Sequence, residues 1–118
     1  MTASTKKRMY ALGRLKTGQM NKTEAAYAAH LEELKRQGSV LWYKFESVKL
    51  RLADNTFYTP DFAVMRADGE IEMHEVKGFW QDDARVKIKV AADKFPFRFI
   101  AIKAESKKNG GGWKVEEF

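Results

Sequence analysis

Two acids and a lysine stand out because their spacing brings them together on one predicted hairpin. Residues 58–80 are typical of two strands joined by a three-residue loop at 67–69, with glycine at the loop position that needs a positive φ. This loop places Asp61 directly opposite Glu75, where Cβ atoms lie roughly 4.5–5.5 Å apart. Lys77 follows on the same face, about 7 Å along the strand. We therefore expect Asp61, Glu75 and Lys77, the hairpin-end cluster, to converge on one spot.

The chemistry of the hairpin-end cluster is that of a cation site. Two carboxylates at this distance repel each other, and one lysine neutralises only one of them. A divalent cation removes the repulsion, and Mg²⁺ favours one or two carboxylates together with waters and phosphate oxygens. The cluster therefore predicts a metal site that acts on a phosphate group.

An alternative explanation is a surface ion pair between Glu75 and Lys77, with Asp61 in a turn after Pro60. The positions that lead away from the cluster favour a site instead, because they are apolar on both faces of the hairpin, as in central strands covered on both sides. They are Ala63, Met65, Ile71 and Met73 on the cluster's own face, and Phe62, Val64 and Val76 on the other. Charges at one end of covered strands favour a functional site.

A fourth acid, Glu24, belongs to a predicted helix over residues 21–37. Asn21 is a good N-cap and Glu24 follows three residues later, so the pair forms a capping box that explains Glu24 by itself. Glu24 also lies on the apolar stripe of the helix, which places it in reach of the hairpin-end cluster. The two histidines are assigned no role: His74 alternates away from Glu75, and His30 is predicted to be solvent-exposed.

Further periodicities predict the elements that position the cluster. A strand over 40–52, broken near 46–47, precedes the hairpin, and a helix over 81–94 and a strand over 97–104 follow it. The second helix must cross the sheet, so the strand after it lies parallel to a neighbouring strand. The order is α-β-β-β-α-β, with a further C-terminal edge strand. We expect an α/β fold with a mixed central sheet flanked by helices.

The composition bounds the class of protein. The chain has 118 residues, of which 44% are hydrophobic and 32% charged, as in one soluble globular domain. No apolar run is long enough to span a membrane, and no secretory signal is recognisable. Zero cysteines exclude disulfides, thiolate metal sites and cysteine nucleophiles. We expect a cytoplasmic protein.

Basic charge is concentrated at the N-terminus. The net charge is +6, from 22 basic and 16 acidic residues, and five of these positive charges fall in residues 1–21, which contain no acid. The basic residues there are Lys6, Lys7, Arg8, Arg14 and Lys16. We predict a flexible arm over residues 1–20 that binds an anionic polymer, although a solvated tail would have the same composition. Arg85 and Lys87 on the second helix allow the same two interpretations.

These residues resemble a known pattern. Glu24 on a first helix, Pro60-Asp61 and Glu75-Val76-Lys77 are similar to the motif of the PD-(D/E)XK nuclease superfamily, whose core has the same α-β-β-β-α-β order. The closer resemblance is to the phage endonuclease I family, which cleaves four-way (Holliday) DNA junctions, because YTPDF and EVKGFWQDDARVKIK are similar to its Pro-Asp and Lys-Gly-x-Trp tracts. The likeness covers about residues 21–103. It implies a restriction-endonuclease-like nuclease domain over 21–118.

The resemblance also implies roles. Asp61 and Glu75 would bind Mg²⁺ or Mn²⁺ with the Val76 carbonyl, Glu24 would complete the metal site, and Lys77 would orient the attacking water. The implied activity is a metal-dependent endonuclease acting on branched DNA that leaves 5′-phosphate and 3′-hydroxyl ends. Resolving a junction needs two paired nicks, so a homodimer is expected, in the host cytoplasm if the chain is phage-encoded.

Two other functions stay open from the sequence. One is a nuclease of the same fold with a nicking, packaging or sequence-specific task, which the sequence does not separate from junction cleavage. The other is a non-catalytic nucleic-acid-binding protein. The intact set of Asp61, Glu75 and Lys77 argues against the second, because a binder gains nothing from acids that face phosphates.

Overall fold

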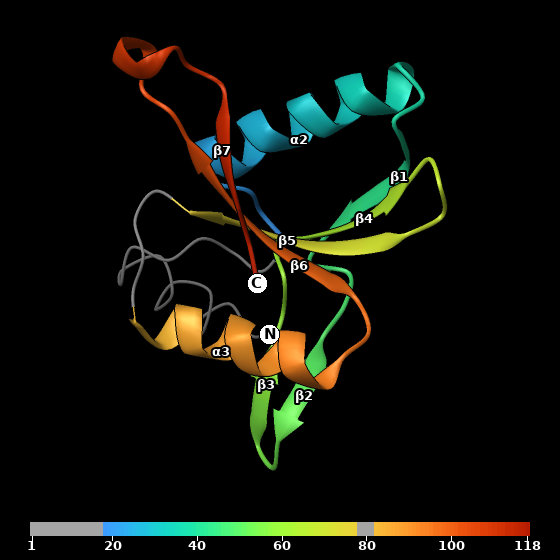
Figure 1. The fold of residues 1–118 in the computed structure, drawn as a ribbon, viewed down its shortest axis with the longest axis vertical. Coiled ribbons are helices and arrows are strands. Elements are labelled where there is room, and N and C mark those ends of the chain that lie inside the picture. The colour runs from blue at the N-terminus through green and yellow to red at the C-terminus, as the bar shows by residue number, and fades with distance from the viewer. Residues whose placement is uncertain (1–17, 78–81) are drawn as a thin grey trace, which may run out of the picture.

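The computed structural model describes residues 18–77 and 82–118. Within these ranges the chain forms two helices, seven strands and one short 3₁₀ turn (Figure 1). In chain order they are α2 Lys22–Arg36, β1 Val40–Phe45, β2 Leu50–Ala53, β3 Thr56–Tyr58, β4 Phe62–Arg66, β5 Ile71–Lys77, α3 Asp82–Lys94, β6 Arg98–Ala104, the 3₁₀ turn η1 Lys107–Asn109 and β7 Trp113–Glu117. Neither helix of these ranges is long and apolar enough to cross a membrane.

Five of the strands form a mixed sheet in the order β1-β4-β5-β6-β7. β5 and β6 are parallel and joined through α3, while the other neighbouring pairs are antiparallel. The α/β class, the mixed sheet, the parallel strand after the second helix and the C-terminal edge strand are confirmed. β5 lies at the centre of this sheet, and its end, which carries Glu75 and Lys77, extends past the start of β4 and stays paired with β6.

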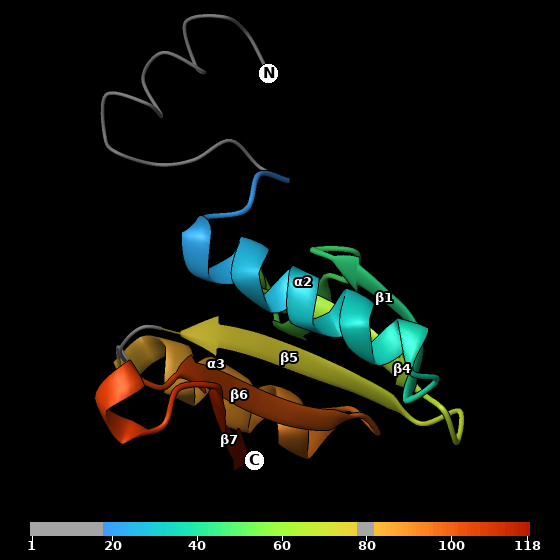
Figure 2. The same cartoon turned by 90° about the horizontal axis from the view of Figure 1, so that it is seen from above.

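The sheet is covered on both faces, as the apolar hairpin predicted. α2 packs on one face, while α3 and the β2–β3 hairpin pack on the other (Figures 1 and 2). Phe62, Val64 and Val76 point into the core under α2, whereas Ala63 and Met73 point into the core under α3. Because side chains alternate between the two faces along β4 and β5, this pair of strands contributes to two separate cores.

The strand predicted over 40–52 divides into two, and its second half leaves the main sheet. The break lies at Glu46, which has a positive φ of 47° and whose N–H donates to the Asp61 carbonyl at 2.8 Å. β2 then pairs with β3 around a turn at Asn55, with φ 54°. Leu50 and Leu52 are buried in the core under α3, which explains why this segment turns away from β4.

The predicted hairpin loop and register are confirmed. The Arg66 N–H donates to the Glu70 carbonyl at 2.8 Å, which closes a three-residue loop, and Gly69 has φ 86°. β4 and β5 pair with Phe62 opposite His74. Continuing this register by one residue brings Asp61, just before β4, opposite Glu75.

Candidate metal-binding and nucleic-acid site

Asp61 and Glu75 meet at the end of β5. The Asp61 Oδ2 accepts a hydrogen bond from the Val76 N–H at 2.8 Å, and the Asp61 and Glu75 side chains lie within hydrogen-bonding reach of each other. Lys77 completes the cluster, because its Nζ lies 3.8 Å from the Glu75 Oε1. The structure therefore brings together the three side chains of the hairpin-end cluster. The Glu75–Lys77 ion pair of the alternative explanation and the contact between Asp61 and Glu75 are therefore both present.

The electrostatics of the cluster are unfavourable for two ionised acids. Burial raises the pKa of Asp61 to about 8, and the charge of Glu75 and a hydrogen bond to it add to the effect. The Val76 N–H and the Lys77 ammonium oppose it in part. With no cation bound, Asp61 therefore keeps a proton through most of the neutral range.

Glu24 serves as a helix cap and as a neighbour of Asp61. The capping box is complete: the Asn21 N–H donates to the Glu24 Oε1 at 2.8 Å, and the Glu24 N–H donates to the Asn21 Oδ1 at 2.8 Å. Burial raises the pKa of Glu24, against the hydrogen bond from the Asn21 backbone, and the charge of Asp61 and a side-chain hydrogen bond to it raise it further. Glu24 therefore caps α2 and also lies within reach of Asp61.

Tyr58 is a member of the site that the sequence did not indicate. Its hydroxyl donates to the Glu75 Oε2 at 2.5 Å, from the end of β3. Burial holds the pKa of Tyr58 well above its usual range, and the charge of Glu75 adds to this, so the hydroxyl remains a donor. The signal available was its place three residues before Asp61 in the YTPDF tract. Which carboxylate it would meet depends on how the β2–β3 hairpin folds back.

An open groove of about 310 Å³ runs along the α3 side of the cluster. Its lining residues are Phe57, Tyr58, Thr59, Glu75, Lys77, Asp83, Ala84 and Lys87. Arg85 and Lys87 are the two residues of the second helix that are predicted to contact nucleic acid. Of these, Lys87 lines this groove and is exposed. Arg85 points elsewhere: its guanidinium forms two hydrogen bonds with Glu116, at 3.0 and 2.8 Å, and lies over the Phe118 ring.

The opposite face of β5 carries a separate buried polar chain. The Tyr27 hydroxyl and the His74 Nδ1 are 2.6 Å apart, and the His74 Nε2 lies 2.9 Å from the Glu72 Oε1. Arg98 bonds the other Glu72 oxygen at 3.0 Å. Since buried polar groups need such partners, His74 has a structural explanation and points away from Glu75, as predicted.

The prediction that His30 is exposed is wrong. Its side chain is half-buried, with ring centroids 5.7 Å from Tyr27 and 6.2 Å from Trp113. The reason is tertiary, because β7 places Trp113 against α2 from the far end of the chain. The basic residues Lys6, Lys7, Arg8, Arg14 and Lys16 lie outside the described residues.

No three His, Cys, Asp or Glu side chains within residues 18–77 and 82–118 form a ready cation cage. Oxygens of the three carboxylates are used by the Asn21, Val76 and Tyr58 donors instead. The donor set nevertheless suits a hard divalent cation, because Asp61 lies within reach of both Glu75 and Glu24, and Lys77 can neutralise only one of these three acids. Comparisons with protein-family models, curated proteins and solved structures find no match for this chain.

Proposed function

We propose that this protein is a metal-dependent DNA endonuclease that acts on branched DNA and leaves 5′-phosphate and 3′-hydroxyl ends. One observation carries the proposal: Glu24, Asp61 and Glu75 gather beside Lys77 at the open end of a central strand. Acids that repel one another at a partly buried position lower the stability of a fold, so a function that needs them, such as holding a cation, accounts for the arrangement.

The fold supports the proposal through the order of its elements. When the β2–β3 hairpin is treated as an insertion, α2-β1-β4-β5-α3-β6 has the order expected for a restriction-endonuclease-like core. The acids also lie where that superfamily's motif would place them, at the end of β5 and just before β4. The choice of branched DNA, and a homodimer to make paired nicks, rests on the resemblance of the sequence tracts.

In this proposal, Mg²⁺ or Mn²⁺ is held by Asp61, Glu75 and the Val76 carbonyl, with Glu24 as a further donor. When bound, the cation polarises the phosphate and lowers the pKa of an attacking water. The chain's own groups do the positioning. The Val76 N–H fixes one Asp61 oxygen, Tyr58 fixes one Glu75 oxygen, and Lys77 offers its ammonium to charge that develops on the phosphate.

The test is cleavage of a labelled four-way junction and of a linear duplex of the same sequence, with Mg²⁺ or with EDTA. We expect Mg²⁺-dependent cutting that Asp61→Asn reduces by at least about a hundredfold, since it removes a charge from the metal site. Asp68→Asn is the matched control, because Asp68 is an exposed acid in the hairpin loop.

Two outcomes separate the parts of the proposal. Equal cutting of duplex and junction would contradict selectivity for junctions and would still support a nuclease. Cleavage that survives both Asp61→Asn and Lys77→Ala would show that the active site lies elsewhere.

A further inference from the structure

Three lysines lie next to one another across the ends of three adjacent strands. Lys77 on β5 is the parallel register partner of Lys103 on β6, and Lys103 is the antiparallel partner of Lys114 on β7. Register partners share a face of the sheet, so Lys103 and Lys114 continue the face that carries Glu75 and Lys77. We call Lys77, Lys103 and Lys114 the lysine row.

The lysine row is electrostatically unfavourable in the protein alone. Like charges directly opposite each other on neighbouring strands destabilise a sheet. Lys103 and Lys114 are exposed, and within residues 18–77 and 82–118 neither forms an ion pair, whereas Lys77 pairs with Glu75. Glu116, whose pKa is lowered mainly by Arg85 and to a smaller extent by the charge of Lys114, is already held by two hydrogen bonds from Arg85.

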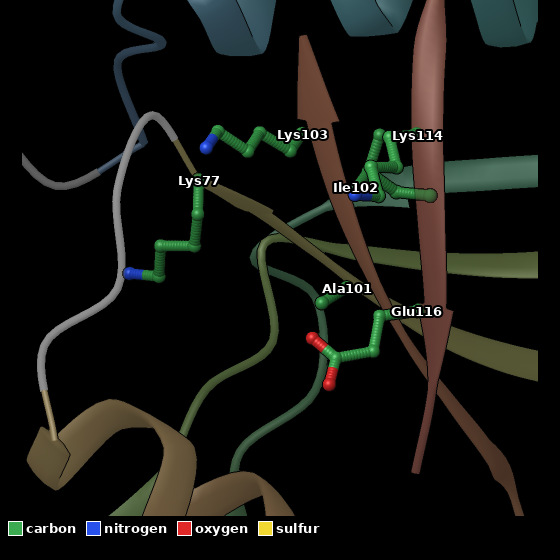
Figure 3. Close-up of a pocket in the computed structure, with 6 residues that line it drawn as sticks. All are labelled: Lys77, Ala101, Ile102, Lys103, Lys114 and Glu116. Atoms are coloured by element: carbon green, nitrogen blue, oxygen red, sulfur yellow. The ribbon is translucent and has the colours of Figure 1, made fainter. Parts of the chain in front are cut away.

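A hollow lies over the lysine row. It has a volume of about 190 Å³ (Figure 3). Its lining residues are Lys77, Ala101, Ile102, Lys103, Lys114 and Glu116. Figure 3 shows Lys103 extending toward the end of β5 that carries Lys77. This volume is small for an organic ligand, which needs roughly 300–1,000 Å³, but it accommodates a single anionic group.

The dimensions of the row match a nucleic-acid backbone. Neighbouring strands lie about 4.8 Å apart, so the row spans about 10 Å from β5 to β7. One DNA strand rises about 3.4 Å per nucleotide, so this length covers about three nucleotides. Because Lys77 belongs to both the row and the candidate active site, a strand that follows the row reaches the carboxylates.

We propose that Lys103 and Lys114 form a phosphate-backbone subsite that continues the candidate active site across β6 and β7. The DNA strand that is cut then lies across the ends of β5, β6 and β7, with its flanking phosphates on this subsite. This inference rests on the proposed function, because DNA is the polyanion that the nuclease proposal supplies.

The test measures DNA binding by the full chain in EDTA, where no cleavage interferes. Fluorescence anisotropy with the labelled junction is followed from about 50 to 200 mM salt. We expect Lys103→Gln/Lys114→Gln to reduce the slope of log K against log salt by about 1.8, which corresponds to two lost phosphate contacts. Each single variant reduces it by about 0.9, and Lys103→Arg/Lys114→Arg keeps it near the wild-type value.

The matched control is Lys35→Gln/Lys94→Gln. Both lysines are exposed, at the C-terminal ends of α2 and α3, so this variant loses the same charge away from the row. We expect its slope to stay within about 0.5 of wild type, because it removes no direct contact. Circular dichroism and thermal unfolding verify that all variants are folded.

The inference is overturned if the row variant binds like wild type, if the control loses as much as the row variant, or if the wild-type chain does not bind DNA. Failure of the proposed function is read separately, by adding Mg²⁺ to the wild type. If DNA binding depends on the lysine row and the wild type cleaves no DNA, the subsite is supported and the nuclease function is contradicted. If the wild type cleaves DNA and the row variant keeps the wild-type salt slope, the nuclease function is supported and the subsite is contradicted.

Discussion

At the scale of single residues, Tyr58 determines the orientation of Glu75. Its hydroxyl donates to one Glu75 oxygen at 2.5 Å. In the proposed metal site, such a bond would orient the ligand. We expect Tyr58→Phe to raise the Mg²⁺ concentration needed for half-maximal cleavage by about tenfold, since the Glu75 carboxylate loses its fixed direction. The measurement is a Mg²⁺ titration of junction cleavage.

Tyr43→Phe is the control for this prediction. It removes a hydroxyl that donates to Glu32 at 2.7 Å, between β1 and α2, and so tests the loss of a hydroxyl away from the site. Identical Mg²⁺ titrations for Tyr58→Phe and Tyr43→Phe would contradict a role for Tyr58 in positioning Glu75.

The protonation of Asp61 predicts how stability depends on pH. Its pKa rises on folding from 3.8 to about 8, so the folded protein keeps a proton that the unfolded chain releases. This contribution to stability is therefore complete below about pH 4 and is lost as the pH rises toward about 8. We expect the free energy of unfolding in EDTA to fall over that range, as measured by urea denaturation.

Two comparisons isolate Asp61 in that measurement. Asp61→Asn flattens the decline, because the amide does not titrate, while Asp68→Asn leaves it unchanged. Mg²⁺ raises the stability mainly at the alkaline end, where Asp61 is ionised. A decline of equal size in Asp61→Asn and wild type would show that another group is responsible.

At the scale of elements, the β4–β5 hairpin sets the register of the site. Gly69 has φ 86° in the loop, and the added Cβ of an alanine would meet open space, so the cost of a substitution there is conformational. We expect Gly69→Ala to destabilise the fold by about 1–2 kcal/mol. Gly69→Asn costs less, because asparagine adopts this backbone region more readily. Urea unfolding measures both, and an equal loss would contradict the conformational explanation.

The elements also show why prediction succeeded locally and failed at longer range. The capping box at Asn21 and Glu24 and the hairpin loop were predictable, because each depends on residues a few positions apart. The departure of β2 from the main sheet was not, because an alternating segment such as that around Leu50 suits any apolar surface. The half-buried state of His30 depends on Trp113, at the other end of the chain.

At the scale of the whole molecule, the N-terminal segment is a second group of basic residues, beside the lysine row, that is predicted to contact DNA. We expect Lys6→Gln/Lys7→Gln/Arg8→Gln to reduce the salt slope of DNA binding by up to about 2.7, one phosphate contact for each charge lost. Thermal unfolding should stay close to wild type. An unchanged salt slope in this variant would mean that these charges serve only as a solvated tail.

The sequence by itself determined the α/β class, the hairpin and the pairing of Asp61 with Glu75, because strand alternation and a three-residue loop leave one register that buries both apolar faces. It also placed Lys77 beside them by spacing alone. Only the tertiary structure decided that Tyr58 holds Glu75, that Glu24 reaches Asp61 while capping its helix, and that Lys103 and Lys114 extend from Lys77. These contacts join elements distant in the chain, and they depend on which strand edges pair, which local patterns do not specify.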